Sequence, residues 1–224
     1  MMKSIAVYHG FRNVSGENVA RALRKLRIPH EMIDAKGIAA GRLASFGAVI
    51  FPGGHSIRIT DKALKETYRF VERGGGLIGI CAGAQFGAHM RFIPVRHKVL
   101  RASGIFDMRV VTKHPVTRGY AVSRPTPKGK RWRYTHRGRI RIRYTNGGVL
   151  IPSPGVTPLV VFDEEGKMPA IVAGKRGRGK VVLMTPHPES TPPPEDCGRW
   201  VSDAAGSQDP LTLFVNAVRY VAGC

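Results

Sequence analysis

A cysteine between a predicted strand and a predicted helix is the residue of this sequence best suited to covalent chemistry. Residues 79–83 read Gly-Ile-Cys-Ala-Gly. In a nucleophile elbow the reactive residue occupies a strained turn, and flanking glycines let the strand and the helix pack closely around it. The same turn would place Cys81 at a helix N-terminus, where unpaired N–H groups favour a thiolate. The alternative is a buried structural cysteine in a glycine-rich turn.

A histidine and a glutamate two residues apart could supply the base that such a nucleophile needs. Residues 185–189 read Thr-Pro-His-Pro-Glu and directly follow a predicted strand. The two prolines restrict the backbone around His187, and Glu189 can accept the imidazole N–H and stabilise the imidazolium. We therefore predict that Cys81, His187 and Glu189 form a catalytic triad. The alternative for this segment is an exposed histidine in a proline-rich loop.

A third segment could bind the negative oxygen that develops during attack on a carbonyl group. Residues 52–54 read Pro-Gly-Gly after another predicted strand. Glycine N–H groups can approach a ligand closely because no side chain intervenes. Gly53 or Gly54, together with the N–H of Ala82, would form an oxyanion hole. Taken alone, these residues indicate only a turn.

The elements that must position these segments alternate along the chain. Helical spacing begins at Ser15, at Asp61 as a plausible N-cap, and after Cys81. Short apolar runs predict the strands, and the last helix comprises residues 211–218; the predicted strands are 4–8, 31–33, 48–51, 77–80 and 180–184. This alternation predicts an α/β fold with a mostly parallel, doubly wound, flavodoxin-like sheet flanked by helices. In such a sheet ligands bind at the carboxyl ends of the strands, where all three segments would meet.

The middle of the chain departs from this pattern. From about residue 99 to 175, short strands rich in Arg, Val, Ile and Tyr alternate with Pro and Gly turns. We predict an antiparallel β insertion there, and a long surface loop over residues 191–208. The length of 224 residues suits one domain, so we expect residues 1–224 to form a single domain.

Three motifs, in this order along the chain, resemble those of class I glutamine amidotransferases. They are Phe-Pro-Gly-Gly at 51–54, Gly-Ile-Cys-Ala-Gly-Ala-Gln at 79–85, and His-Pro-Glu at 187–189. Within that superfamily the sequence is most similar to the amidotransferase-like domain at the N-terminus of eukaryotic biotin-protein ligases, which also occurs as free-standing proteins. Supporting segments are residues 71–76, 144–148 and 179–183.

The resemblance implies a thiol-dependent amidohydrolase with no cofactor and a small amide, such as glutamine, as substrate. It implies the same triad and oxyanion hole, and it adds Gln85 to the substrate-binding residues. It does not imply biotinylation, because the chain contains no biotin-ligase catalytic domain. The histidines at 89, 97 and 114 lack metal-ligand spacing, so we predict no metal site.

A strong positive charge is the unusual feature of the composition. The chain has 36 Lys and Arg residues against 15 Asp and Glu residues, a formal net charge of +21. Residues 108–162 include no carboxylate, and at 139–144 arginines alternate with apolar residues as on a strand with one apolar face. The candidate partner-binding residues of this basic region are Lys130, Arg131, Arg133, Arg137, Arg139, Arg141 and Arg143.

Three interpretations of the basic region remain open. It could bind RNA or the ribosome, with Trp132, Tyr134 and Tyr144 as stacking surfaces. It could dock an acidic protein such as a synthetase partner, or it could be a solvated face without a partner. The three cysteines and the short apolar run after Met1 lead us to expect a reduced, cytoplasmic protein that does not enter a membrane.

Overall fold

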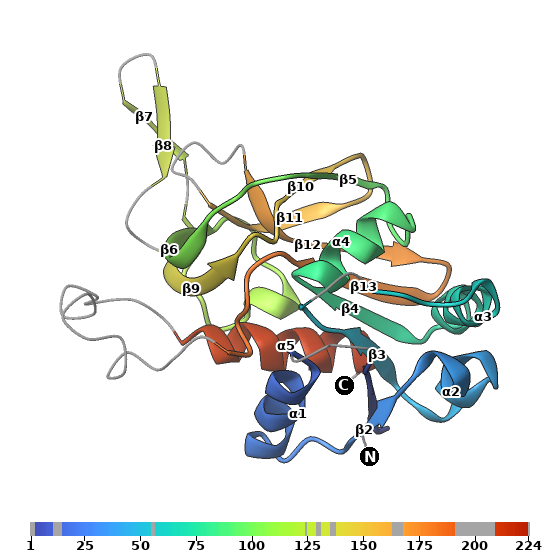
Figure 1. Cartoon of the computed structure of the whole chain (residues 1–224). Coiled ribbons are helices and arrows are strands. Elements are labelled where there is room, and N and C mark those ends of the chain that lie inside the picture. Colours follow the sequence, from blue (N-terminus) through green and yellow to red (C-terminus); the bar gives the residue numbers. More distant parts are fainter. Residues whose placement is uncertain are drawn as a thin grey trace.

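Five parallel strands form one half of a nine-stranded central sheet (Figure 1). The computed structural model describes residues 3–10, 15–54, 57–123, 125–128, 131–134, 138–162, 168–190 and 209–223, with the backbone alone at 125–128 and 131–134. The parallel strands, in spatial order, are β2 (His30–Ile33), β1 (Ile5–Tyr8), β3 (Ala48–Phe51), β4 (Gly76–Ile80) and β13 (Gly179–Met184). This order is the flavodoxin-like arrangement that the sequence predicts.

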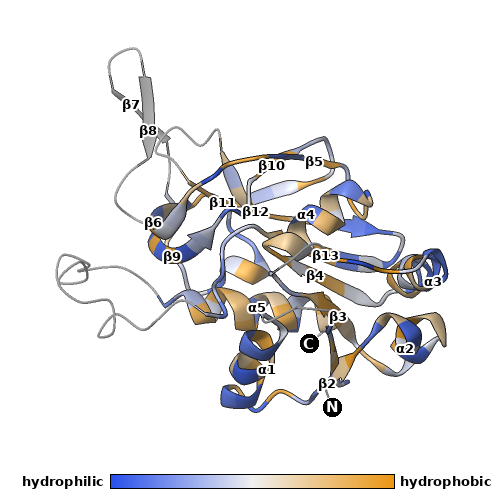
Figure 2. Ribbon diagram, in the orientation of Figure 1, coloured by the Kyte–Doolittle hydropathy of each residue, from blue (hydrophilic) through white to orange (hydrophobic). Residues whose placement is uncertain are grey.

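Helices cover both faces of the parallel strands, as predicted for a doubly wound sheet. One face is covered by α1 (Ser15–Lys25) and α5 (Pro210–Ala222), and the other by α2 (Ala35–Ala39), α3 (Asp61–Glu72) and α4 (Ala82–His89). Alternate strand residues enter two separate cores, so β1, β3 and β4 are buried throughout. Figure 2 shows the result: hydrophobic strands in the interior, and hydrophilic residues along the outer sides of α1 and α3.

Four antiparallel strands form the other half of the same sheet. They are β12 (Pro169–Arg176), β11 (Thr157–Val161), β6 (Ser103–Val110) and β9 (Arg139–Thr145), in this order from β13 outward. The sheet is therefore mixed rather than mostly parallel. The tight β12–β13 hairpin makes β12 antiparallel to β13, so this region extends the sheet instead of forming a separate layer.

Two smaller strand pairs complete the β structure that is described. One joins β5 (Val95–Lys98) to β10 (Val149–Pro152), and the other joins β7 (Pro125–Lys128) to β8 (Arg131–Tyr134). Short 3-10 helices lie at η1 (Arg42–Ser45) and η2 (Pro115–Thr117). Residues 191–208, where we predicted a surface loop, lie outside the described residues.

The predicted alternation along strand β9 is confirmed. Ile140, Ile142 and Tyr144 are fully buried. Arg139 and Arg141 are half-buried on the opposite face, and Arg143 on that face is exposed. Because successive strand residues face opposite sides, one run of sequence supplies both an apolar core face and a basic outer face.

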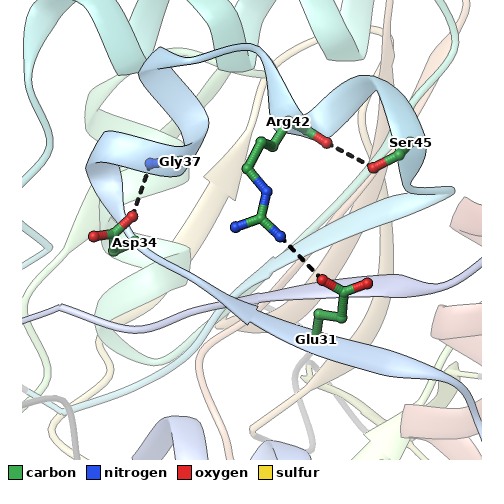
Figure 3. Close-up of polar contacts among 5 residues, drawn as sticks. All are labelled: Glu31, Asp34, Gly37, Arg42 and Ser45. Carbon is green, nitrogen blue, oxygen red and sulfur yellow. Dashed lines mark hydrogen bonds and ion pairs between the residues drawn. The ribbon is translucent and has the colours of Figure 1, made fainter.

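A short connection between β2 and β3 was not predicted from the sequence. Asp34 caps α2 by accepting a 2.7 Å hydrogen bond from the N–H of Gly37, and Arg42 forms a 3.1 Å ion pair with Glu31 (Figure 3). The Ser45 hydroxyl donates to the carbonyl of Arg42 at 2.9 Å. Local side-chain bonds thus shape elements too short to give a periodic pattern.

The N-cap of α3 also differs from the prediction. The side chain of Thr60 accepts a hydrogen bond from the N–H of Ala63, and Asp61 is instead the first helical residue. Both residue types are good N-caps, so the sequence alone could not separate them.

Within the described ranges, none of the helices has the length and apolar character needed to cross a membrane.

Candidate active site

The candidate site lies where three neighbouring parallel strands end. Strand β4 is paired with β3 on one side and with β13 on the other. Gly53 follows the end of β3, Cys81 follows β4, and His187 follows β13. All three strands run in the same direction, so the three predicted segments emerge at one edge of the sheet.

Cys81 occupies a strained turn at the start of α4. Its backbone has φ 51° and ψ −109°, a sparsely populated positive-φ conformation that costs a residue with a side chain about 1–3 kcal/mol. Its N–H donates a 2.7 Å hydrogen bond to the carbonyl of Met184, the last residue of β13. The turn therefore fixes Cys81 against the strand that leads to His187.

Two glycines make the turn sterically feasible. A methyl group added at Gly79 would lie 2.4 Å from the carbonyl oxygen of Gly83. A methyl group at Gly83 would lie 1.8 Å from the carbonyl oxygen of Phe51. Strand β4, helix α4 and strand β3 approach each other too closely for any Cβ at these positions, as an elbow requires.

His187 and Glu189 form a buried polar pair beside the cysteine. Nδ1 of His187 lies 3.0 Å from Oε1 of Glu189, and the glutamate side chain is 0% exposed. A carboxylate can only accept, so Nδ1 carries the proton in this bond and Nε2 is left for other chemistry. The other carboxylate oxygen of Glu189, Oε2, is buried and has no hydrogen-bond partner among the described residues.

Cys81 and His187 interact directly, and this interaction raises the pKa of the imidazole. Burial lowers the pKa of His187, but hydrogen bonds with Cys81 and Glu189 and the negative charges of both raise that pKa to about 10. The imidazole is therefore protonated at neutral pH. A protonated imidazole beside a cysteine stabilises the thiolate, which is the nucleophilic form of the thiol.

Gly53 contacts both members of the cysteine–histidine pair. A methyl group at Gly53 would lie 2.7 Å from Cε1 of His187, 3.1 Å from Cβ of Cys81 and 3.5 Å from Oγ of Ser15. A side chain at this position would therefore displace the imidazole. The proximity of Ser15, at the start of α1, had no signal in the sequence.

The other predicted binding residues lie around the elbow. The N–H of Ala82, in the first turn of α4, has no acceptor within the helix. Gly54 is exposed with φ 105°, a conformation that favours glycine. Gln85 is half-buried one turn along α4, and its N–H donates to the carbonyl of Cys81 at 3.0 Å.

Strand β9 contributes two backbone carbonyls that the sequence analysis missed. The sulfur of Cys81 lies 3.4 Å from the carbonyl oxygen of Thr145 and donates a hydrogen bond to it in the thiol form. The N–H of His187 donates to the carbonyl oxygen of Arg143 at 2.7 Å. Every residue has a carbonyl, so residue identity does not signal this role; the only sequence sign nearby was the Asn-Gly-Gly turn at 146–148.

Of the seven predicted basic residues, three have described side chains: Arg139, Arg141 and Arg143. Lys130 and Arg137 lie outside the described residues, and the side chains of Arg131 and Arg133 on β8 are likewise outside them. Arg139 and Arg141 both form ion pairs with Asp107 on the neighbouring strand β6. Pairing of β6 with β9 thus places Asp107, which directly precedes the carboxylate-free residues 108–162, beside these two arginines.

Two further features bear on the predicted partner surface. Tyr144 is fully buried, so it is unavailable as a stacking surface for a base. Trp132 and Tyr134 belong to β8, where the backbone alone is described. No cluster of three or more His, Cys, Asp or Glu side chains within the described ranges could hold a metal ion.

Comparison with known proteins gives structural likeness alone. No protein-family model and no curated protein sequence matches the chain. PurLQS from Thermotoga maritima superposes with a TM-score of 0.68 at 19% identity, covering 98% of this chain and 99% of that chain. A GMP synthase subunit from Thermoplasma acidophilum gives 0.65 at 16% identity, covering 100% of this chain and 96% of that chain.

A glutamine amidotransferase from Thermotoga maritima gives a TM-score of 0.59 at 14% identity and covers 100% of both chains. Likeness at such low identity concerns architecture, and one fold can host several functions. The chain therefore shares its fold with glutamine amidotransferase-type proteins.

Proposed function

We propose that this protein is a thiol-dependent amidohydrolase of the class I glutamine amidotransferase-like superfamily. The observation that carries the proposal is the contact chain from Cys81 through His187 to Glu189. The fold shared with amidotransferase-type proteins supports it. From the resemblance of its sequence motifs, the proposal also relates this protein to the amidotransferase-like N-terminal domain of biotin-protein ligases.

The proposed reaction begins with attack by sulfur. The Cys81 thiolate forms a bond to the carbonyl carbon of a small amide, and the N–H groups of Ala82 and of Gly53 or Gly54 bind the resulting oxyanion. The His187 imidazolium then donates its proton to the leaving nitrogen, which departs as ammonia when the amide is primary. Glu189 keeps the imidazole oriented and offsets its charge.

The second half of the reaction regenerates the enzyme. The acyl group is now a thioester on Cys81, and His187 is neutral. A water molecule attacks the thioester carbonyl while His187 removes its proton, so that the carboxylic acid leaves and the thiolate and imidazolium are restored. Glutamine is the proposed substrate, with glutamate and ammonia as its products.

The test compares labelling and turnover. Iodoacetamide should alkylate Cys81 before Cys197 or Cys224 in the native protein, because the protonated His187 makes its sulfur the most nucleophilic. Wild-type protein should release ammonia from L-glutamine, and Cys81→Ser should not. Equal labelling of all three cysteines, together with wild-type ammonia release by Cys81→Ser, would rule the mechanism out.

RNA or ribosome binding through the middle region is the second candidate function. It is favoured by the exposed side chain of Arg143 on β9 and by the net charge of +21. Such binding should weaken steeply with salt and should weaken further in Arg143→Ala. Binding that is equal for wild type and this variant would reject the role of β9, and preference for an acidic protein would identify the other class of partner.

A further inference from the structure

Three consecutive residues of strand β9 hold the candidate site from one side. The carbonyl of Arg143 accepts a hydrogen bond from the N–H of His187, and the carbonyl oxygen of Thr145 lies 3.4 Å from the sulfur of Cys81, from which it accepts a hydrogen bond in the thiol form. Tyr144 lies between them, and its side chain faces the opposite way into the core. The position of this strand end therefore affects both members of the cysteine–histidine pair.

The hydroxyl of Tyr144 fixes the strand end. It accepts a 2.7 Å hydrogen bond from the N–H of Gly148 and donates a 2.7 Å hydrogen bond to the carbonyl of Leu100. Burial raises the pKa of this phenol, so the hydroxyl keeps the proton that it donates. One atom thus joins the turn after β9 to the segment before β6.

The ring of Tyr144 is held independently of its hydroxyl. It makes edge-on contacts with Phe106 and Phe162, with centroid distances of 5.5 Å and 4.9 Å. Aromatic packing of this kind persists when a tyrosine is changed to phenylalanine. Removing the oxygen alone therefore leaves the core filled while it releases the turn.

The turn at residues 146–148 packs closely against the segment that leads to His187. A methyl group at Gly147 would lie 2.2 Å from the carbonyl oxygen of Thr185, two residues before His187. His97 also donates from Nε2 to the carbonyl of Gly147 at 3.0 Å. Asn146 and Gly148 both have positive φ values, 52° and 78°, so the turn has a specific backbone shape.

We propose that Tyr144 is a positioning residue whose hydroxyl, through Gly148 and Leu100, holds the carbonyls of Arg143 and Thr145 against His187 and Cys81. This inference rests on the proposed function of the pair. Its physical basis is that small displacements of reacting groups strongly reduce rates, whereas stability depends mainly on packing that the ring provides.

The experiment compares two tyrosines that differ in location. Tyr144→Phe removes the hydroxyl at the site. Tyr68→Phe is the matched control, because Tyr68 also donates to a backbone carbonyl, that of Met90, but lies on α3 away from the site. We would measure the rate constant for alkylation of Cys81 by iodoacetamide at pH 7, along with thermal unfolding of both variants.

The expected result is a fall of about 10-fold in the alkylation rate constant for Tyr144→Phe, with Tyr68→Phe equal to wild type. For L-glutamine hydrolysis, kcat should fall without a change in KM. His97→Ala releases the same turn from its other side and should slow alkylation in the same direction, which covers the case of a Tyr144 variant that fails to fold. Alkylation of the folded Tyr144→Phe protein as fast as that of Tyr68→Phe would overturn the proposal.

Failure of the proposed function gives a different outcome. If wild-type protein hydrolyses no L-glutamine, the alkylation comparison still tests the role of Tyr144. If Cys81 is not reactive even in wild type, the proposed mechanism fails. NMR titration of the His187 imidazole then tests the positioning: its pKa should fall in Tyr144→Phe but not in Tyr68→Phe.

Discussion

The backbone N–H of His187 donates a 2.7 Å hydrogen bond to the carbonyl oxygen of Arg143. Strands β12, β11 and β6 separate β13, which leads to His187, from β9, which carries Arg143. The two ends of this series nevertheless meet at the carboxyl ends of the parallel strands, where β9 also contacts Cys81. Strand β9 of the predicted antiparallel insertion therefore lines the candidate site.

Replacing Gly53 by alanine should impair catalysis without unfolding the protein. The added methyl group would lie 2.7 Å from Cε1 of His187 and would displace the imidazole from Cys81. We expect kcat for L-glutamine hydrolysis to fall by about 100-fold. Gly47→Ala, at the other end of β3, is the control, because its methyl group would meet the Cβ of Lys3 at 3.2 Å, far from the site. Equal activity of the two variants would contradict the contact.

Gly83→Ala should destabilise the fold itself. Its methyl group would lie 1.8 Å from a backbone oxygen of Phe51, so helix α4 would have to move away from β3. We expect the free energy of unfolding, measured by urea denaturation, to fall by about 3 kcal/mol. Gly87→Ala, on the same helix, would meet only the flexible Cδ2 of Leu183 at 2.6 Å and should cost about 1 kcal/mol. The reverse ranking would show that the elbow has more room than the structure indicates.

Glu189→Gln should lower the pKa of His187. The carboxylate of Glu189 stabilises the imidazolium by a hydrogen bond and by its charge, and the amide would keep only the hydrogen bond. Wild-type His187 should stay protonated up to a pH of about 10, whereas in the variant it should lose its proton at a lower pH, with the hydrogen bond and charge of Cys81 still raising its pKa. NMR titration of the imidazole measures this directly, and hydrolysis should slow by about 100-fold.

Glu66→Gln is the control for this change. Glu66 is paired with Arg69 on the surface of α3 at 2.6 Å and has no contact with the site. Its removal should leave the His187 titration unaltered. A Glu189→Gln protein with the wild-type His187 pKa would mean that Cys81 alone sets the charge of the imidazole.

Asp107→Asn should destabilise the protein at neutral pH. Partial burial raises the pKa of Asp107, but Arg139, Arg141 and Arg109 lower it more strongly, so its net pKa lies below the usual value. A lowered folded-state pKa adds stability above the unfolded-state value of about 4, and this stability is lost as the pH falls through the folded-state pKa. We expect the variant to lose about 1–2 kcal/mol of unfolding free energy at pH 7.

The pH dependence and a second ion pair make this prediction specific. The difference between wild type and Asp107→Asn should shrink as the pH falls below about 4, because the wild-type carboxyl is then also neutral. Glu31→Gln breaks the exposed pair with Arg42 shown in Figure 3 and should cost less than about 0.5 kcal/mol. Equal losses for the two variants would argue against a special role of Asp107.

The sequence by itself predicted the parallel half of the fold and the three segments of the candidate site. Buried parallel strands consist of short apolar runs, and Gly53, Gly79 and Gly83 mark close approaches that no other residue permits. Cys81, His187 and Glu189 were found because their chemistry depends on side-chain type. Such features are local, so a single sequence can display them.

Only the tertiary structure decided how the middle of the chain relates to the site. Pairing of β6 with β9 placed Asp107 opposite Arg141, which turned part of the predicted basic patch into an ion-paired network. Long-range packing also placed the carbonyls of Arg143 and Thr145 against His187 and Cys81. Strand order, register and carbonyl positions depend on contacts between residues distant in sequence, and backbone atoms are the same at every residue. For that reason residue types alone could not predict them.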